Sequence, residues 1–176
     1  MPKTTTDVSS EEVAYIFGLR LDPGGAEAEW FTLWFEDDDR KLLVERDRIL
    51  WVRSQREAEA LVPIRGGHVA LSAEQPAILD LPDLIGQMSK AVPRDPGRFW
   101  NGIELVDDLN QAVDSLGLGL TQAFGSQSTA VLNRVRNALM DGKRVGGALK
   151  AGGGTETVSR AVFEILGRAL ACSRLS

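Results

Sequence analysis

The chain has few of the side chains that most often carry enzyme chemistry. It contains one cysteine, Cys172, and one histidine, His68. A single cysteine excludes an internal disulfide and a thiolate metal cluster, and a single histidine excludes a metal site built from several imidazoles. His68 has no cysteine or carboxylate at ligand spacing, and no serine lies in a Gly-x-Ser-x-Gly motif. We therefore expect no metal, no cofactor and no catalytic residue, and we leave the role of His68 open.

Long apolar runs and concentrated positive charge are also missing. Charges or glycines interrupt each apolar stretch well before the roughly 20 residues that a membrane-spanning helix needs. The net charge is −5, with basic residues interleaved among acidic ones, so no segment provides a basic surface for a phosphate backbone. Residues 1–7 are polar and lack the apolar core of a secretory signal. We expect a soluble, cytoplasmic protein that binds neither nucleic acid nor membrane.

The first half of the chain has the period-two pattern of β-strands. β-Branched and aromatic residues alternate with other residues, and polar or glycine-rich turns separate the runs. This pattern predicts a meander of about four antiparallel strands. The predicted strands lie at residues 12–21, 29–36, 41–45 and 48–53.

Two helix starts follow the strands. Ser54 and Glu57 have the spacing of a capping box, which predicts a short helix. Asp80 stands two residues before Pro82, and this pair predicts the N-cap and first turn of a second helix. Between the two helices, residues 65–71 suggest a turn and a few strand residues.

The second half has helical periodicity. Two prolines and a glycine within residues 92–97 indicate a linker. Beyond it, apolar residues recur at a spacing that predicts about three helices, one of them capped by Ser126 and the last starting near Thr155. The expected fold class is α+β, with an antiparallel sheet plus short helices in residues 1–92 and a helical region in 98–176, packed on or beside the sheet. One globule and two lobes both remain open.

The most informative segment is a run of glycines near the C-terminus. Gly152, Gly153 and Gly154 stand between Lys150 and Thr155. The segment lacks the lysine of a phosphate-binding loop and the spacing of a dinucleotide fingerprint. A flexible or tightly turning connection is the plain interpretation. Because glycine has no Cβ, such a loop also suits entry into a narrow groove of a partner enzyme, and anion binding at a helix start is a further alternative.

An acidic run forms a second candidate contact surface. Asp37, Asp38 and Asp39 follow the second predicted strand. Such a run is more often a solvated hairpin tip, and the functional alternative is an acidic surface that docks against a basic partner.

Two stretches of the sequence are distinctive: Phe-Trp-Asn-Gly-Ile-Glu-Leu-Val-Asp-Asp at residues 99–108 and Lys-Ala-Gly-Gly-Gly-Thr-Glu-Thr at 150–157. With these stretches, its length and its acidic α+β composition, the chain resembles the immunity proteins of bacterial polymorphic toxin systems, most closely the immunity factor for tuberculosis necrotizing toxin. The resemblance implies a cytosolic antitoxin that forms a tight one-to-one complex with a toxin, an NAD-degrading glycohydrolase.

The glycine run suggests how such an antitoxin would work. We hypothesise that Gly152, Gly153 and Gly154, with Lys150 and Thr155, enter the nicotinamide nucleotide cleft of the toxin. Inhibition is then steric, and this chain is not an enzyme.

Two alternatives come from other classes of protein. A secretion chaperone has the same size, charge and composition, but it binds an extended segment of an effector. A small nucleotide-binding enzyme would use the glycine run for phosphate and Asp107 or Asp108 for a metal. A nucleotide that binds the native state raises its melting temperature, which separates this last case from the others.

Overall fold

The larger sheet is built around strand β1 (Glu12–Arg20), which has neighbours on both sides. On one side it pairs antiparallel with β2 (Trp30–Glu36), which in turn pairs with the short β3 (Lys41–Leu42). On the other side it pairs in parallel with β6 (Val69–Leu71) and β7 (Ala77–Asp80). The computed structural model describes residues 12–36, 41–62, 69–90, 94–116 and 122–176.

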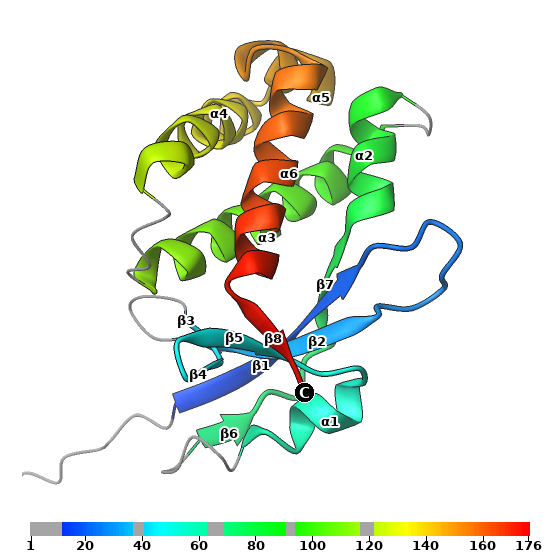
Figure 1. The fold of residues 1–176 in the computed structure, drawn as a ribbon. Coiled ribbons are helices and arrows are strands. Elements are labelled where there is room, and N and C mark those ends of the chain that lie inside the picture. Colours follow the sequence, from blue (N-terminus) through cyan, green and yellow to red (C-terminus); the bar gives the residue numbers. More distant parts are fainter. Residues whose placement is uncertain (1–11, 37–40, 63–68, 91–93, 117–121) are drawn as a thin grey trace, which may run out of the picture.

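A second, smaller sheet contains β4 (Val44–Glu45), β5 (Arg48–Trp51) and β8 (Ser173–Leu175). The strands of the predicted meander therefore divide between two sheets after β3. Arg46 and Asp47 both have positive φ and form the tight turn between β4 and β5. Strand β8 pairs in parallel with β5, so the C-terminal strand closes a sheet that starts in the first half of the chain (Figure 1).

Both predicted N-caps of the first half are confirmed. Helix α1 (Gln55–Glu59) starts at Ser54, whose Oγ accepts a hydrogen bond from the Glu57 amide at 3.2 Å while the Glu57 carboxylate accepts one from the Ser54 amide at 3.1 Å. Helix α2 (Leu81–Ser89) starts at Asp80, whose Oδ1 accepts a hydrogen bond from the amide of Asp83 at 2.9 Å.

The predicted fold class, α+β, is confirmed: strands dominate the first half of the chain and helices the second. The helices of the second half are α3 (Pro96–Ser115), α4 (Gln122–Met140), α5 (Val145–Ala151) and α6 (Thr155–Ala171). They lie together on one side of the strands (Figure 1). Within the described residues, no helix combines the length and the apolar character that crossing a membrane requires.

Two local predictions in this half are wrong, and one helix was missed. Pro96 and Gly97 belong to α3 and not to a linker, because Asp95 caps the helix by accepting a hydrogen bond from the Gly97 amide at 2.9 Å. Ser126 lies inside α4 and is not its cap, since the helix already begins at Gln122. Helix α5 was not predicted, because two of its residues are glycines, which weaken an isolated helix but are tolerated in one held by packing.

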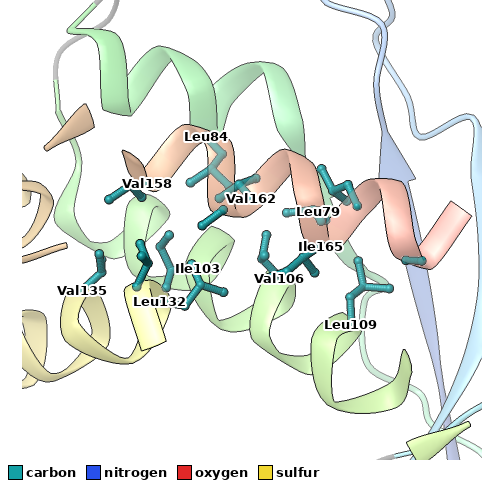
Figure 2. Close-up of a cluster of buried hydrophobic side chains, with 14 of the residues drawn as sticks. Leu79, Leu84, Ile103, Val106, Leu109, Leu132, Val135, Val158, Val162 and Ile165 are labelled. Atoms are coloured by element: carbon teal, nitrogen blue, oxygen red, sulfur yellow. The ribbon is translucent and has the colours of Figure 1, made fainter. Parts of the chain in front are cut away.

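One hydrophobic cluster joins the two halves of the chain. Phe17 and Leu19 of β1 contribute to the same buried cluster as the helices of the second half. Their neighbours Ala14 and Ile16 point to the opposite face of β1, as strand alternation requires, and belong to a second cluster beneath α1. Each fully buried aliphatic side chain contributes about 1.5–3 kcal/mol. Figure 2 labels ten members of the larger cluster: Leu79, Leu84, Ile103, Val106, Leu109, Leu132, Val135, Val158, Val162 and Ile165.

Candidate functional site

The glycine run forms a compact turn between α5 and α6. The Gly154 amide donates a hydrogen bond to the carbonyl of Leu149 at 2.8 Å, and the Gly153 amide donates one to the carbonyl of Lys150 at 3.1 Å. These two bonds define a Schellman motif, which ends a helix with a residue of positive φ. Gly153 has that conformation, with φ of 102°, and Gly154 follows with φ of 99°. The local turn thus accounts for both glycines.

The residues proposed to contact a partner differ in exposure. Gly152 is buried, and a Cβ added to it would lie 2.6 Å from a methyl group of Val135 and of Val158. It therefore has no surface to offer a partner. Lys150, Gly153 and Thr155 are exposed, and Gly154 is partly exposed, so the turn does present a small surface. Its role in binding a partner stays a prediction.

The structure describes only some of the other sequence-based candidates. Asp37, Asp38, Asp39 and His68 lie outside the described residues. Asp107 is buried, and its Oδ2 accepts hydrogen bonds from Arg136 Nη1 at 2.8 Å and from Gln111 Nε2 at 2.9 Å. The bond from Arg136 ties α3 to α4, whereas Gln111 lies on α3 itself. Within the described residues, no group of three or more His, Cys, Asp or Glu side chains is arranged to hold a metal ion.

Arg136 also contacts Glu104, one turn before Asp107 on α3. Its Nε donates to Glu104 Oε1 at 2.5 Å. This hydrogen bond raises the pKa of Arg136, and the negative charges of Asp107, Glu104 and Asp108 act in the same direction against the opposing effect of burial. The interaction of Arg136 with Glu104 and Asp107 holds α4 against α3, which is a structural role.

Sequence reasoning missed a polar cleft beside β7. The cleft has a volume of about 460 Å³, within the roughly 300–1,000 Å³ typical of ligand pockets. We name it the β7 cleft. It is lined by Arg20 of β1, Ile78 and Asp80 of β7, Asp83 and Leu84 of α2, and Arg98, Asn101 and Gly102 of α3.

Local pairing fixes two of its charged groups. Arg20 and Asp80 are opposite each other in the parallel ladder of β1 and β7, so their side chains share a face of the sheet. Arg20 Nη1 donates to Asp80 Oδ2 at 2.6 Å, while Asp80 Oδ1 caps α2 by accepting the amide hydrogen of Asp83. Both oxygens of Asp80 therefore have donors within the protein.

The guanidinium groups of the cleft have fewer short hydrogen bonds than the Asp80 carboxylate, because some of their N–H donors lack an acceptor within the parts of the chain that the structure describes. Arg98, whose side chain is 70% exposed, comes no closer than 3.8 Å to Asp83 and 4.0 Å to Asp95, beyond a normal hydrogen bond. The Nε of Arg20 is buried and has no hydrogen-bond acceptor among the described residues. The cleft thus contains more donors than acceptors.

Strand β7 has a second property that bears on binding. It pairs with β1 on one side, and no other strand in the described part of the chain pairs with it. In a parallel ladder, alternate residues direct their backbone N–H and C=O groups away from the neighbouring strand. Groups of this kind are the ones that pair with an added strand. Ile78, in the middle of β7, is 37% exposed and lines the cleft.

The sequence has no detectable relative among family models or curated proteins: no family model matches the chain, and no curated protein matches it. In fold, it is similar to the C-terminal domain of SatS, known from a crystal structure in complex with bromine. The TM-score is 0.50 and the identity 14%, over 93% of this chain and 94% of that chain. This likeness extends over nearly the whole of both chains and concerns the fold alone.

Proposed function

We propose that this chain is a binding protein without catalytic activity, which holds an extended segment of a partner protein along β7. The observation that carries the proposal is the outer edge of β7, which has no strand partner among the described residues, beside a cleft of peptide-compatible size. Extended peptides bind such edges by adding a strand, with the backbone giving affinity and neighbouring pockets giving specificity. Among the functions that the sequence suggests, the proposal corresponds to a secretion chaperone, which binds its partner in the cytoplasm before export.

The chemistry of the β7 cleft favours binding over turnover. The side chains around it are guanidinium, carboxylate, amide and aliphatic groups. General acid–base chemistry requires a group free to exchange a proton with the substrate. Of the two carboxylates that line the cleft, Asp80 is already held by Arg20 and by the N-terminus of α2, and Asp83 lies 3.8 Å from the guanidinium of Arg98. The proposal therefore includes no cofactor, no metal and no catalytic residue.

The antitoxin hypothesis remains a second candidate, favoured by the exposed surface at Lys150, Gly153 and Thr155. In that case the partner is a folded NAD-degrading toxin, bound one-to-one, and the α5–α6 turn enters its cleft. Deleting the glycine run is a poor test, because the deletion also removes the Schellman motif. Lys150→Glu is better, since Lys150 is exposed and the substitution keeps the turn.

A matched pair of tryptophan substitutions tests the proposal. Asn101 is exposed on α3 and lines the cleft, and Asn133 is exposed on α4 outside it. Asn101→Trp fills the cleft, whereas Asn133→Trp adds the same bulk elsewhere. A partner co-purified from the native host is identified and re-added to each purified variant, and its affinity is measured.

We expect Asn101→Trp to weaken the complex and Asn133→Trp and Lys150→Glu to leave it intact. Hydrogen exchange should show new protection of the β7 amides when the partner binds. A partner whose binding depends on Lys150 and ignores Asn101→Trp would favour the antitoxin hypothesis and refute the proposal.

A further inference from the structure

We infer that the segment held in the β7 cleft carries a carboxylate, which binds between Arg20 and Arg98. This inference rests on the proposed function and adds the chemistry of the partner. It starts from the unequal number of donors and acceptors around the cleft.

On the acceptor side, the protein has little left to offer its own arginines. Asp80 uses one oxygen for Arg20 and the other for the N-terminus of α2. Asp83 accepts a long hydrogen bond from Gln87 Nε2 at 3.5 Å and lies 3.8 Å from Arg98. A ligand that brings acceptors therefore completes the site, and one that brings further donors does not.

On the donor side, both groups suit a carboxylate. A guanidinium presents paired N–H donors in a plane, and a carboxylate accepts them two at a time. Arg98 has its donors free of short contacts, and Arg20 lines the cleft with its Nη1 held by Asp80. A carboxylate that enters the cleft therefore meets two guanidinium groups, one of which, Arg98, has no short contact with a protein acceptor.

The aliphatic wall identifies the carboxylate as part of a peptide. Ile78 and Leu84 line the cleft beside the arginines, and Ile78 belongs to β7, whose outer edge has no strand partner among the described residues. A free phosphate ion would use the arginines but neither the edge nor the aliphatic wall. An extended segment with an acidic residue or a terminal carboxylate uses all three.

Asp83 provides an internal check, because its carboxylate also faces the cleft. A bound carboxylate must lie on the arginine side and away from Asp83, since like charges repel. Replacing Asp83 by Asn should therefore tighten binding of an acidic peptide and leave binding of a neutral one unchanged. A merely structural role of Asp83 would not separate the two peptides.

The test uses three synthetic seven-residue peptides of alternating valine and threonine. The first has a central glutamate and amidated C-terminus, the second a central glutamine and amidated C-terminus, and the third a central glutamine and free C-terminus. Fluorescence anisotropy measures their affinity for the full-length wild-type chain, Arg98→Gln and Asp83→Asn. Arg98 is mostly exposed, so Arg98→Gln should fold, which melting curves verify. Inorganic phosphate is added as a competitor.

We expect the glutamate peptide, the free-terminus peptide or both to bind about tenfold more tightly than the neutral peptide, as a charge-assisted hydrogen bond predicts. Arg98→Gln should remove this difference. Comparing the two acidic peptides identifies the source of the carboxylate, and weak competition by phosphate supports the contribution of the strand edge.

Two outcomes refute the inference in distinguishable ways. If all three peptides bind equally and Asn101→Trp blocks them, the proposed function stands and the carboxylate preference is wrong. If none binds, or if phosphate alone displaces the acidic peptides completely, the strand-edge site itself fails and the proposed function fails with it.

Discussion

Gly152 lies between Val135 of α4 and Val158 of α6, with room for a hydrogen atom where any other residue has a Cβ. Its φ is −71°, which every residue type adopts. The glycine is therefore required by the close approach of the helices and not by the backbone conformation. This distinguishes it from Gly153 and Gly154, whose positive φ values belong to the turn itself.

Gly152→Ala should lower the free energy of unfolding by about 1–3 kcal/mol, because the added methyl overpacks a filled site. Urea denaturation measures the change. Gly167→Ala on α6 is the matched control: its Cβ would meet nothing within 4 Å, and the substitution should stabilise the helix by about 0.5–1 kcal/mol. A Gly152→Ala variant as stable as the wild type would show that Val135 and Val158 do not enclose this site.

Arg136→Met should destabilise the protein by about 2–3 kcal/mol, because it leaves the buried Asp107 carboxylate without its cation. Arg136 is partly exposed, which keeps the loss below that of a fully buried pair. Asp107→Leu added to Arg136→Met should recover part of the loss. If the double variant is no more stable than Arg136→Met, the two residues are not coupled.

The pH dependence of the contact of Arg136 with Glu104 and Asp107 follows from the raised pKa of Arg136, which is caused chiefly by its hydrogen bond to Glu104. A raised folded-state pKa gives stability that is fully present below the ordinary arginine value and is lost only above it. The stability difference between the wild type and Arg136→Met should therefore stay constant from about pH 7 to 10. A steady decline over this range, in urea titrations at each pH, would contradict the assigned contact.

Ser173→Ala should destabilise the protein by about 1–2 kcal/mol, because the Ser173 hydroxyl accepts the indole N–H of Trp51 at 2.8 Å. Trp51 is 1% exposed, so water cannot replace the acceptor without rearrangement. Leu175→Ala, on the same strand but 58% exposed, should change stability by less than about 0.5 kcal/mol. Equal effects of the two substitutions would show that β8 is held by its backbone alone.

Ser54→Ala should cost about 1 kcal/mol, the usual value for a lost N-cap. The substitution removes the acceptor of the Glu57 amide hydrogen. Gln55→Ala is the control, since Gln55 is exposed on the same helix. Chemical denaturation of both variants checks the difference, and a Ser54→Ala variant that matches the control would mean that the capping box adds nothing to stability.

The features that the sequence predicted correctly are those set by near neighbours in the chain. The caps at Ser54 and Asp80 need residues only three positions away, and the alternation along β1 records which side chains face the two clusters. Helix α6 likewise begins at the predicted Thr155. Such short-range contacts can be predicted from the sequence, because the groups that form them are already close together in the chain.

The glycine run cannot be interpreted from its near neighbours in the chain alone. Its composition alone fits a loop, a turn or an anion site, and only the packing of α4 against α6 explains why Gly152 lacks a side chain. The β7 cleft is a stronger case. Arg20 and Asp80 are 60 positions apart, and Arg98 comes from a third element. The sequence alone determined the α+β class and the caps at Ser54 and Asp80, whereas parallel pairing and helix packing decided which distant charges meet, because neither of two remote segments records which partner it will contact.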